Sequence, residues 1–509
     1  MPRTSQFNLT LNKYVHSKDN DFSEHMKLHG DVIVIGSGAT GTWAARLLTQ
    51  NGFKVILIDG GFEPPERPRL DTMTLSKKEF PYGTSPGKPF DWIRVRALGG
   101  RMNVWSRTAI RMSNMDFTAP ERDGFGEPWP FSYDDLVPFY EHAEEAFKII
   151  GCNEGVSQIP DGKVIKIQPS SMHRYFKKKI EGHWKNRKVI VARDAIAGIH
   201  KQLFLAQKTG RLSVYDGLLA HKLLESANGK KVQEVVAIDV RSKKEVLLTG
   251  RAVVLCASTI ESTRILLDSK TKRQPQGFAN SSGVLGHYLM DHTIVDCEGL
   301  IPFDKGRKNL ITQFSSSVIP DFCSGHRKDF LRGYLFLCDW HPCPQNSGGV
   351  CHYGSHHPPH AGHFFFRVKG EVLPYFSNCV SLNSRRKDIN GVATVDIHFE
   401  CKTNERRLIA DKKKTAVEVA EAAGLVPLGK PVELVPGTSA HEVGTARMGK
   451  DPKKSVLNPY NQSWDFENLY VMDGSCFVSA GSQNPTLTML ALCHRACNHL
   501  SSQLKYKII

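Results

Sequence analysis

The stretch Asp31-Val-Ile-Val-Ile-Gly36-Ser-Gly38-Ala-Thr-Gly41 decides the fold, because an apolar strand runs into glycines spaced Gly-x-Gly-x-x-Gly. Gly36 allows the tight turn, Gly38 leaves room for a pyrophosphate at a helix N-terminus, and Gly41 lets that helix pack close to the strand. A second apolar strand follows and ends in Asp59, which can accept hydrogen bonds from a ribose. The pattern predicts a dinucleotide site. The alternative is a turn without a ligand, and this element alone does not distinguish FAD from NAD(P).

The size and composition describe an ordinary globular chain with more than one core. With 509 residues the chain is too long for one simple core, so we expect two interwoven domains. No apolar run approaches the length of a membrane span. The first thirty residues lack the apolar core of a secretory signal, so the sequence predicts a cytoplasmic location. Export in complex with a signal-bearing partner is the alternative.

The net charge of +16 has two interpretations. Basic residues gather at 177–179, 385–387 and 412–414. None of these clusters is interleaved with aromatic residues, and no nucleic-acid-binding module is recognisable, so nucleic acid is not an expected partner. The clusters are expected to be solvated basic faces. The alternative is a surface that steers an acidic partner, such as an electron-acceptor protein.

A second turn made of small residues is expected after the glycine-rich one. Short strands are predicted at 213–215, 232–240, 246–248 and 252–256. The last of them runs into Ala257-Ser258-Thr259 and a helix that continues to Leu267, a pattern typical of backbone that approaches a cofactor. Earlier in the chain, a helix is predicted at 136–149, with Ser132 or Asp134 at its start and Gly151 at its end.

The middle of the chain is expected to form a separate domain. Residues 296–430 mix strand-like runs, at 363–368 and 392–399, with irregular loops. This pattern predicts an antiparallel, substrate-facing domain. A strand at 468–472 and a closing helix at 486–500 follow, so we expect the N- and C-terminal parts to build one domain together.

The segment His441-Glu-Val-Gly-Thr-Ala-Arg-Met-Gly449 resembles the C-terminal signature of the glucose-methanol-choline (GMC) flavoprotein oxidoreductases. Residues 468–475 and 481–488 continue this signature. The segments 98–100, 129–130, 253–259 and 280–292 are also similar to that family, although Ser258 stands where the family more often has glycine. The resemblance spans nearly the whole chain in the correct order and is weakest between 300 and 365.

The resemblance implies an α/β fold: a Rossmann-like FAD-binding domain with an interrupting antiparallel-sheet substrate domain. The FAD-binding parts would be 25–118, 191–295 and 433–509, and the substrate or cap parts 119–190 and 296–432. The cofactor would be bound by residues of both small-residue turns, of the 98–105 loop and of the C-terminal signature, namely Gly36, Gly38, Ala39, Thr40, Gly41, Asp59, Gly60, Gly99, Gly100, Arg101, Asn103, Val104, Trp105, Ala257, Ser258, Asp473, Gly474, Asn484, Pro485 and Thr486.

The resemblance also assigns a catalytic pair. Removing hydride from a carbinol carbon requires the hydroxyl proton to leave as well, and a neutral imidazole suits that task. His441 would be the general base facing the flavin N5, and Asn484 would hold the same hydroxyl. Asparagine at this second place is shared with pyranose oxidases and sugar dehydrogenases, including glucoside 3-dehydrogenases. The alternatives are a structural histidine and a cap before Pro485. Glu371 is expected to line the substrate cavity, or to be an ordinary strand-end acid.

Two further expectations concern cofactor attachment and metal. Pyranose oxidases carry a histidine that links covalently to FAD, and Val104 stands at the corresponding place, so non-covalent FAD is predicted. Twelve irregularly spaced cysteines do not form a disulfide framework, and Cys256 is expected to be buried. Cysteine and histidine crowd 338–363. Zinc is the alternative there, but the paired short spacings of a structural site are missing, so no metal is predicted and a sugar-contacting loop is favoured.

The activity implied is FAD-dependent oxidation of a secondary hydroxyl of a sugar or glycoside, at C3 or C2, to a ketosugar. A C3 dehydrogenase that uses an acceptor other than oxygen is preferred. The alternatives are an oxidase that produces hydrogen peroxide, a non-redox lyase of the same fold, and an FAD-bearing subunit without catalysis. The expected partners are the sugar, an electron acceptor (oxygen, quinone or cytochrome) and, as in some related dehydrogenases, a small helper subunit.

Overall fold

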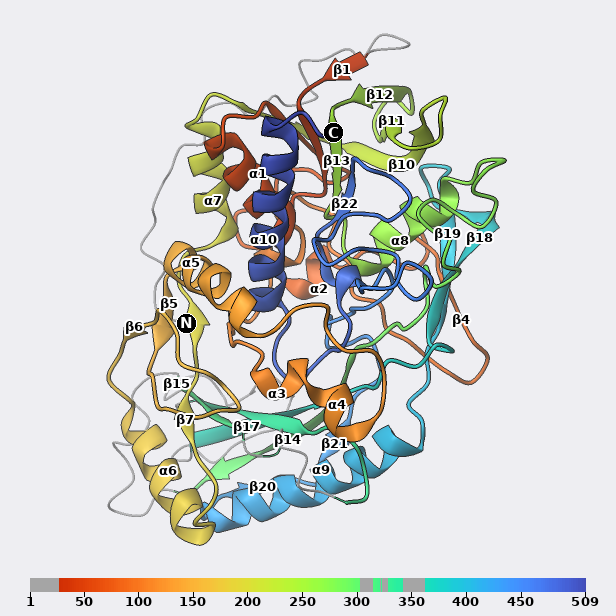
Figure 1. Ribbon diagram of the computed structural model, residues 1–509. Coiled ribbons are helices and arrows are strands. Elements are labelled where there is room, and N and C mark those ends of the chain that lie inside the picture. Colours follow the sequence, from red (N-terminus) through yellow and green to blue (C-terminus); the bar gives the residue numbers. More distant parts are fainter. Residues whose placement is uncertain (1–26, 303–314, 321, 323–327, 342–361) are drawn as a thin grey trace.

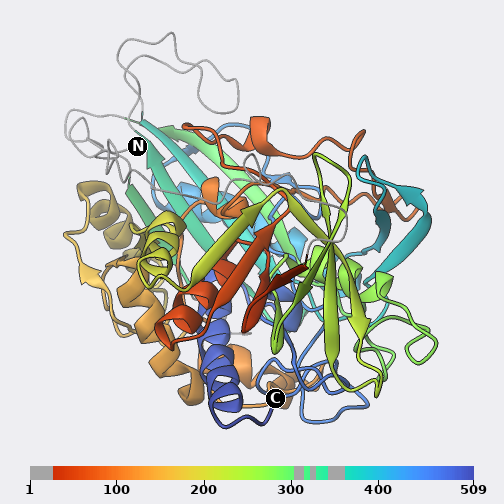
Figure 2. The same ribbon diagram turned by 90° about the horizontal axis from the view of Figure 1, so that it is seen from above.

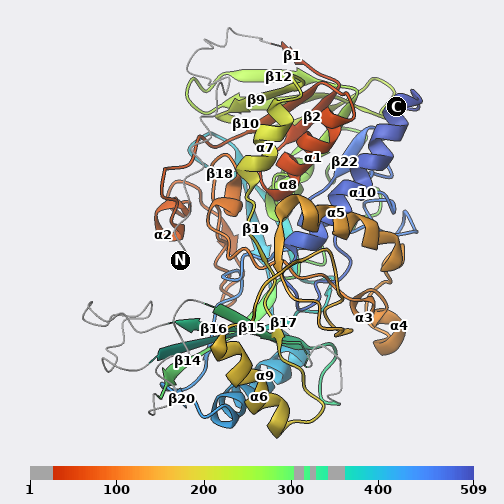
Figure 3. The same cartoon turned by 90° about the vertical axis from the view of Figure 1, so that its left-hand side faces the viewer.

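The computed structural model describes residues 27–302, 315–320, 322, 328–341 and 362–509. Figures 1 and 3 show two stacked parts: one contains a parallel sheet with helices against it, and the other a broad antiparallel sheet backed by helices. Figure 2 views the chain from the side of the first part. The expected α/β class, with an interrupting antiparallel-sheet domain, is confirmed.

The parallel sheet is built from three distant parts of the chain. Its strand order is β22 (Leu469–Val471), β13 (Ala252–Leu255), β2 (Val32–Ile35), β3 (Val55–Asp59) and β9 (Leu212–Asp216), and every neighbouring pair is parallel. The apolar runs of β2 and β13 are buried throughout, as expected where both faces of a sheet are covered. Helix α1 (Ala39–Gln50) packs against α7 (Ile199–Gln207) and α10 (Thr486–Lys505). The N- and C-terminal parts therefore share one domain.

The antiparallel sheet forms the second part. It joins β20 (Val426–Pro427), β14 (His292–Ile301), β17 (Gly362–Glu371), β16 (Tyr334–His341), β15 (Ser315–Ile319) and β7 (Ile190–Val191), and β21 (Val432–Glu433) also pairs with β14. Helices α6 (Ser171–His183) and α9 (Thr403–Ala422) lie beneath it in Figure 3. The boundary expected between residues 295 and 296 falls inside β14. One face of this sheet points toward the FAD-binding part.

Three smaller sheets complete the fold. The first joins β1 (Lys27–His29), β12 (Glu245–Thr249), β11 (Val232–Asp239) and β10 (Leu218–Glu225). The second joins β18 (Cys379–Lys387), β19 (Ala393–His398) and β4 (Gly83–Thr84), and the third joins β6 (Ile165–Lys166), β5 (Ile149–Gly151) and β8 (Asp194–Ala195). The remaining helices are α2 (Leu70–Met73), α3 (Asn114–Phe117), α4 (Ala119–Asp123), α5 (Val137–Phe147) and α8 (Thr259–Asp268).

Some local expectations need correction. The helix expected at 136–149 is α5, which ends at Phe147 because Lys148 takes a left-handed conformation and the next residues enter β5. Within 296–430 only strands and irregular loops are expected, but residues 403–422 form the twenty-residue helix α9. Lys412, placed in a solvated basic cluster, is instead fully buried on α9, and its Nζ donates to the carbonyl oxygens of Thr293 and Val368.

The described cysteines and helices bear on two expectations from the sequence. Cys256 is buried, as expected, and burial raises the pKa of its thiol. The nine cysteines that the structure describes are all free. Within the same ranges, no helix has the length and apolarity needed to cross a bilayer.

Candidate active site

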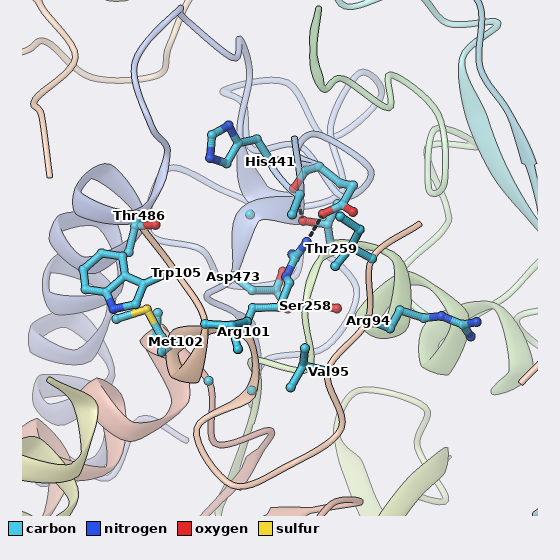
Figure 4. A pocket seen from close by; sticks show the side chains of 18 of the residues that line it. Arg94, Val95, Arg101, Met102, Trp105, Ser258, Thr259, His441, Asp473 and Thr486 are labelled. Carbon is cyan, nitrogen blue, oxygen red and sulfur yellow. Dashed lines mark hydrogen bonds and ion pairs between the residues drawn. The ribbon is translucent and has the colours of Figure 1, made fainter. Parts of the chain in front are cut away.

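A cavity of about 620 Å³ lies between the carboxyl ends of the parallel strands and the inner face of the antiparallel sheet. The ends of open parallel strands are where α/β folds bind cofactors. The cavity brings together most of the residues expected to bind the cofactor, and it also contains His441, the expected general base, which is labelled in Figure 4. The predicted residues that line it are Gly36, Gly38, Ala39, Thr40, Asp59, Gly60, Gly100, Arg101, Val104, Trp105, Ala257, Ser258, His441, Asp473, Gly474, Asn484, Pro485 and Thr486.

Three predicted cofactor-binding residues are not among the described residues that line this cavity: Gly41, Gly99 and Asn103. They shape the turn and the loop that form its walls. A Cβ on Gly41 would overlap the carbonyl oxygen of Gly36, so the missing side chain allows α1 to pack on the turn. Gly99 takes a left-handed φ of +90°. The Asn103 amide nitrogen donates to the carbonyl oxygens of Leu98 and Gly100, each at 2.9 Å, which fixes the loop that carries Arg101.

The glycine-rich turn is shaped for a dinucleotide. Gly36 takes a φ of +96°, and a Cβ there would collide with backbone at Cys256, whereas a Cβ on Gly38 would meet no protein atom within 4 Å. Open space therefore lies where a pyrophosphate would approach. Helix α1 begins beside that space without a side-chain cap, and so do α8 and α10, whose first residues also line the cavity. Three uncapped helix N-termini favour an anionic ligand, which FAD is.

Asp59 lies at the edge of this space, but its carboxylate is also occupied by the protein. It accepts hydrogen bonds from the backbone nitrogens of Ser37 and Gly61, each at 2.8 Å. Burial raises the pKa of Asp59, and the bonds from Ser37 oppose that rise. The remaining acceptor capacity of Asp59 is what a ribose would use.

The imidazole of His441 is oriented by a second histidine that the sequence analysis did not single out. His292 Nδ1 lies 2.8 Å from His441 Nδ1, and His292 Nε2 lies 2.9 Å from the carbonyl oxygen of Gly481. A carbonyl oxygen only accepts, so His292 carries its proton on Nε2. Burial lowers the pKa of His292 to about 3 and that of His441 well below 6.5, so both rings are neutral near pH 7.

These bonds assign the tautomer of His441. Neutral His292 can only accept at Nδ1, so His441 must donate from its own Nδ1. The Nε2 of His441 is then left with a lone pair. It lies 3.4 Å from Nδ2 of Asn484, at the wall of the cavity. The arrangement presents a base of the kind that accepts a hydroxyl proton.

Asp291 holds the backbone of the same loop. Its carboxylate accepts from the Gly437 nitrogen at 2.7 Å, from the Ser439 hydroxyl, and from the His441 nitrogen at 3.3 Å. Burial and the nearby Glu442 raise the pKa of Asp291 to about 6. The adjacent residues Asp291 and His292 therefore fix the main chain and the side chain of His441 respectively.

Asn484 is oriented in the same way by Lys369. The Lys369 Nζ donates to Oδ1 of Asn484. An ammonium group only donates, so it faces the amide oxygen and not the amide nitrogen. This assigns Oδ1 to the lysine and leaves Nδ2 to face His441. A hydroxyl on the cavity side of both nitrogens would receive a hydrogen bond from Asn484 and give its proton toward His441.

The chain matches known proteins over its whole length. The family model described as GMC oxidoreductase matches residues 374–493. The 2-methyl-1,2-propanediol dehydrogenase of Mycolicibacterium austroafricanum is 28% identical over 92% of this chain and 95% of its own. The fructose dehydrogenase large subunit of Gluconobacter japonicus is 23% identical over 94% and 99% respectively. The C-glycoside 3-oxidase of Arthrobacter globiformis is 30% identical, but over only 25% of this chain. The formate oxidase of Aspergillus oryzae RIB40 shares the fold, with a TM-score of 0.68, 15% identity and coverage of 95% of this chain and all of that one.

The resemblance to the GMC oxidoreductases is confirmed by the family match at residues 374–493 and by the relatives. The family is one of FAD-dependent enzymes, so the expected cofactor is FAD, in agreement with the fit of the glycine-rich turn. The wall opposite that turn comes from the antiparallel sheet. It carries Phe365, Arg367 and Lys369 from alternate positions of β17, and Asp339 from the neighbouring strand β16.

The charged groups of this sheet wall are mostly paired. Arg367 donates to both carboxylate oxygens of Asp296, at 2.9 and 2.7 Å. Asp339 accepts from the Ser316 hydroxyl at 2.6 Å. Burial and the charge of Asp339 raise the pKa of Asp194 to about 6.

Glu371 lies behind this wall and is not among the described residues that line the cavity. Its carboxylate accepts from Arg332 at 3.1 Å, and burial raises its pKa to about 7. The expected substrate contact of Glu371 therefore remains a prediction. Arg101 also has a partner in the protein: it lies 2.6 Å from Glu442, the ion pair dashed in Figure 4.

Most of the cysteine- and histidine-rich segment, 342–361, lies outside the described residues. Of its described members, Cys338 is fully buried, and His363 lies 3.3 Å from Glu298. Within the described ranges, no group of three or more metal-ligating side chains comes together.

Proposed function

We propose that this GMC oxidoreductase oxidises a secondary hydroxyl of a sugar or glycoside, at C3 or C2, to the corresponding ketosugar. Oxidation of a CH–OH group is supported by the dehydrogenases and oxidases among the relatives. The observation that carries the proposal is the pair formed by the unprotonated Nε2 of His441 and the N–H of Asn484, which lie 3.4 Å apart at the cavity wall. One group accepts a proton and the other donates one, which together are complementary to a hydroxyl.

Each part of the centre has a defined task in the proposed reaction. Asn484 Nδ2 donates to the substrate oxygen and holds the carbinol carbon in place. His441 Nε2 accepts the hydroxyl proton, and His292 takes up the hydrogen bond from the far side of the ring as positive charge develops. When FAD is bound, it supplies the acceptor for the hydride that leaves the carbinol carbon. The turn at Gly36–Gly38 and the N-termini of α1, α8 and α10 would hold it.

The sugar class is supported by the polar sheet wall, where Asp339, Arg367 and Ser316 line the cavity together with Phe365. It is also supported by the fructose dehydrogenase and C-glycoside 3-oxidase among the relatives. The C3 position and a non-oxygen acceptor, a quinone or cytochrome, are part of the proposal. So is a small helper subunit, since one relative is named as a large subunit.

The test is the visible spectrum of the purified holoenzyme, mixed without oxygen with glucose and with several glucosides. Bleaching of the oxidised flavin by a sugar would support the proposal. Carbon-13 NMR of the product would then separate C3 from C2, and fast recolouring in air would indicate an oxidase. A flavin that only non-sugar alcohols bleach would refute the sugar assignment, and one that no alcohol bleaches would favour a lyase or a non-catalytic subunit.

A further inference from the structure

Lys369 is a buried lysine at the reaction centre that the mechanism above uses only as a partner of Asn484. It lies on β17, with Ile294 and Leu335 opposite it on the neighbouring strands, and it is 2% exposed. Its Nζ reaches the cavity and donates to Oδ1 of Asn484. Burying a lysine removes its charge from water, which costs free energy unless hydrogen-bond partners or opposite charges compensate.

We infer that Lys369 is a positioning residue of the reaction centre, which fixes the amide of Asn484 and supplies positive charge next to the substrate oxygen. This inference rests on the proposed function. Without Lys369, the amide of Asn484 could turn over and present Oδ1 to His441, where two acceptors would repel each other. With Lys369, only Nδ2 faces the substrate, and partial negative charge on the substrate oxygen lies one residue away from an ammonium group.

The charge of Lys369 depends on pH near neutrality. Burial and the neighbouring Arg367 lower its pKa to about 7, while Asp339, Asp296 and Asp194 oppose that shift. His441 and His292 also face it, and its charge lowers the pKa of both. Lys369 is therefore an ammonium below about pH 7 and an amine above it. Any rate that needs the charge falls as the pH rises through this range.

Lys412 provides a matched control within the same domain. It is fully buried on α9, and its pKa is likewise lowered to about 7. Its Nζ donates to the carbonyl and hydroxyl oxygens of Thr293, each at 2.8 Å, and to the carbonyl oxygen of Val368. These contacts are to β14 and β17 and do not include the catalytic pair. A purely structural role for buried lysines predicts that K369M and K412M behave alike.

Three variants separate orientation from charge. K369M removes both, K369Q keeps a donor for Asn484 without charge, and K369R keeps the charge at every accessible pH. The holoenzyme of each is reduced anaerobically, by stopped flow from pH 5.5 to 9.5, with the alcohol that bleaches the wild type fastest. We expect K369M to reduce its flavin roughly 10- to 100-fold more slowly. This is less than the roughly 100- to 1000-fold loss of a donor that touches the reacting oxygen, because Lys369 acts through Asn484. K369Q should be slowed less and should lose the alkaline decline, and K369R should move that decline above the range.

A second measurement does not depend on turnover. The dissociation constant of the wild-type enzyme's own ketone product is measured by its perturbation of the oxidised flavin spectrum. It should rise in K369M and stay near the wild-type value in K412M. The inference is overturned if K369M and K412M share one pH profile and one product affinity. A wild type bleached only by a non-sugar alcohol overturns the sugar assignment and leaves this comparison intact, and a flavin that no alcohol bleaches overturns both.

Discussion

Replacing His292 by phenylalanine is expected to slow the reaction although the proposed base, His441, stays in place. The H292F variant keeps an aromatic ring but loses the acceptor for His441 Nδ1–H, at 2.8 Å, and the donor to the Gly481 carbonyl, at 2.9 Å. A buried donor left without a partner costs about 1–3 kcal/mol. That cost falls on the tautomer of His441 that the reaction needs, so the rate constant for flavin reduction should fall roughly 5- to 150-fold, at 1.36 kcal/mol per factor of ten.

The matched variant is H292Q. A glutamine can accept from His441 with its carbonyl oxygen and donate to Gly481 with its amide, so it should recover a large part of the rate. The pair His142 and His494, with Nδ1 atoms 3.2 Å apart beside Trp43, offers a control away from the centre. H142F loses a similar contact and should leave flavin reduction unchanged.

Anaerobic stopped flow with a substrate deuterated at the carbinol carbon is the assay. The melting temperature of each variant is measured beside it, because an unpaired Gly481 carbonyl also lowers the free energy of unfolding. If H292F reduces its flavin as fast as the wild type, the assignment of the His441 tautomer by His292 is wrong. The same conclusion would follow if H292Q were slower than H292F at equal stability.

Three further outcomes are expected. Because burial lowers the pKa of His441 well below 6.5, its imidazole should stay neutral at pH 6.5 and contribute no acid limb to kcat/KM there. NMR of the His441 ring measures this directly, and a ring that takes up a proton near pH 6.5 would contradict the site. G38A should keep a normal melting temperature, since its Cβ meets no protein atom within 4 Å, but should bind less flavin because that Cβ occupies the space for the pyrophosphate. G41A should lose stability and flavin together, because its Cβ overlaps the carbonyl oxygen of Gly36. Flavin content and calorimetry distinguish the two variants. Acid precipitation should release the yellow colour into the supernatant, since Val104 has no side chain that can bind FAD covalently, and colour kept in the pellet would refute this.

The parallel part of the fold could be predicted because its signals are local. The strand β2, the glycine turn and α1 follow one another within twenty residues, and each glycine has one steric reason. Helix α9 was missed although its pattern was present: Leu408, Ile409, Ala416 and Val419 recur at helical spacing and are buried. The lysines within the helix drew attention to charge, and one of them, Lys412, is buried only because Thr293 and Val368 supply acceptors from distant strands.

The proposed catalytic centre likewise contains residues that the sequence predicts and residues that only the structure shows. His441 and Asn484 stand in a recognisable motif, whereas His292 and Lys369 reach them only through the tertiary structure. Lys369 faces the cavity because the register of β17 places it on the same side as Arg367 and Phe365, and a shift by one residue would turn it away. No single-sequence pattern fixes that register.

The residues found by motif and those found only in the structure have different tasks. This explains why only the first group could be found in the sequence. A base and a hydrogen-bond donor must be particular residue types, so His441 and Asn484 carry a signature. Their tautomer and amide orientation, by contrast, can be set by any neighbour that offers the right donor or acceptor. His292 and Lys369 do so here from β14 and β17, two adjacent strands of the substrate sheet. The antiparallel sheet, which we propose contacts the substrate, therefore also sets the proton positions of the proposed catalytic pair. A change in β14 or β17 made to alter substrate preference should then change the pH profile as well, and this coupling distinguishes the present centre from one whose histidine is held only by its own loop.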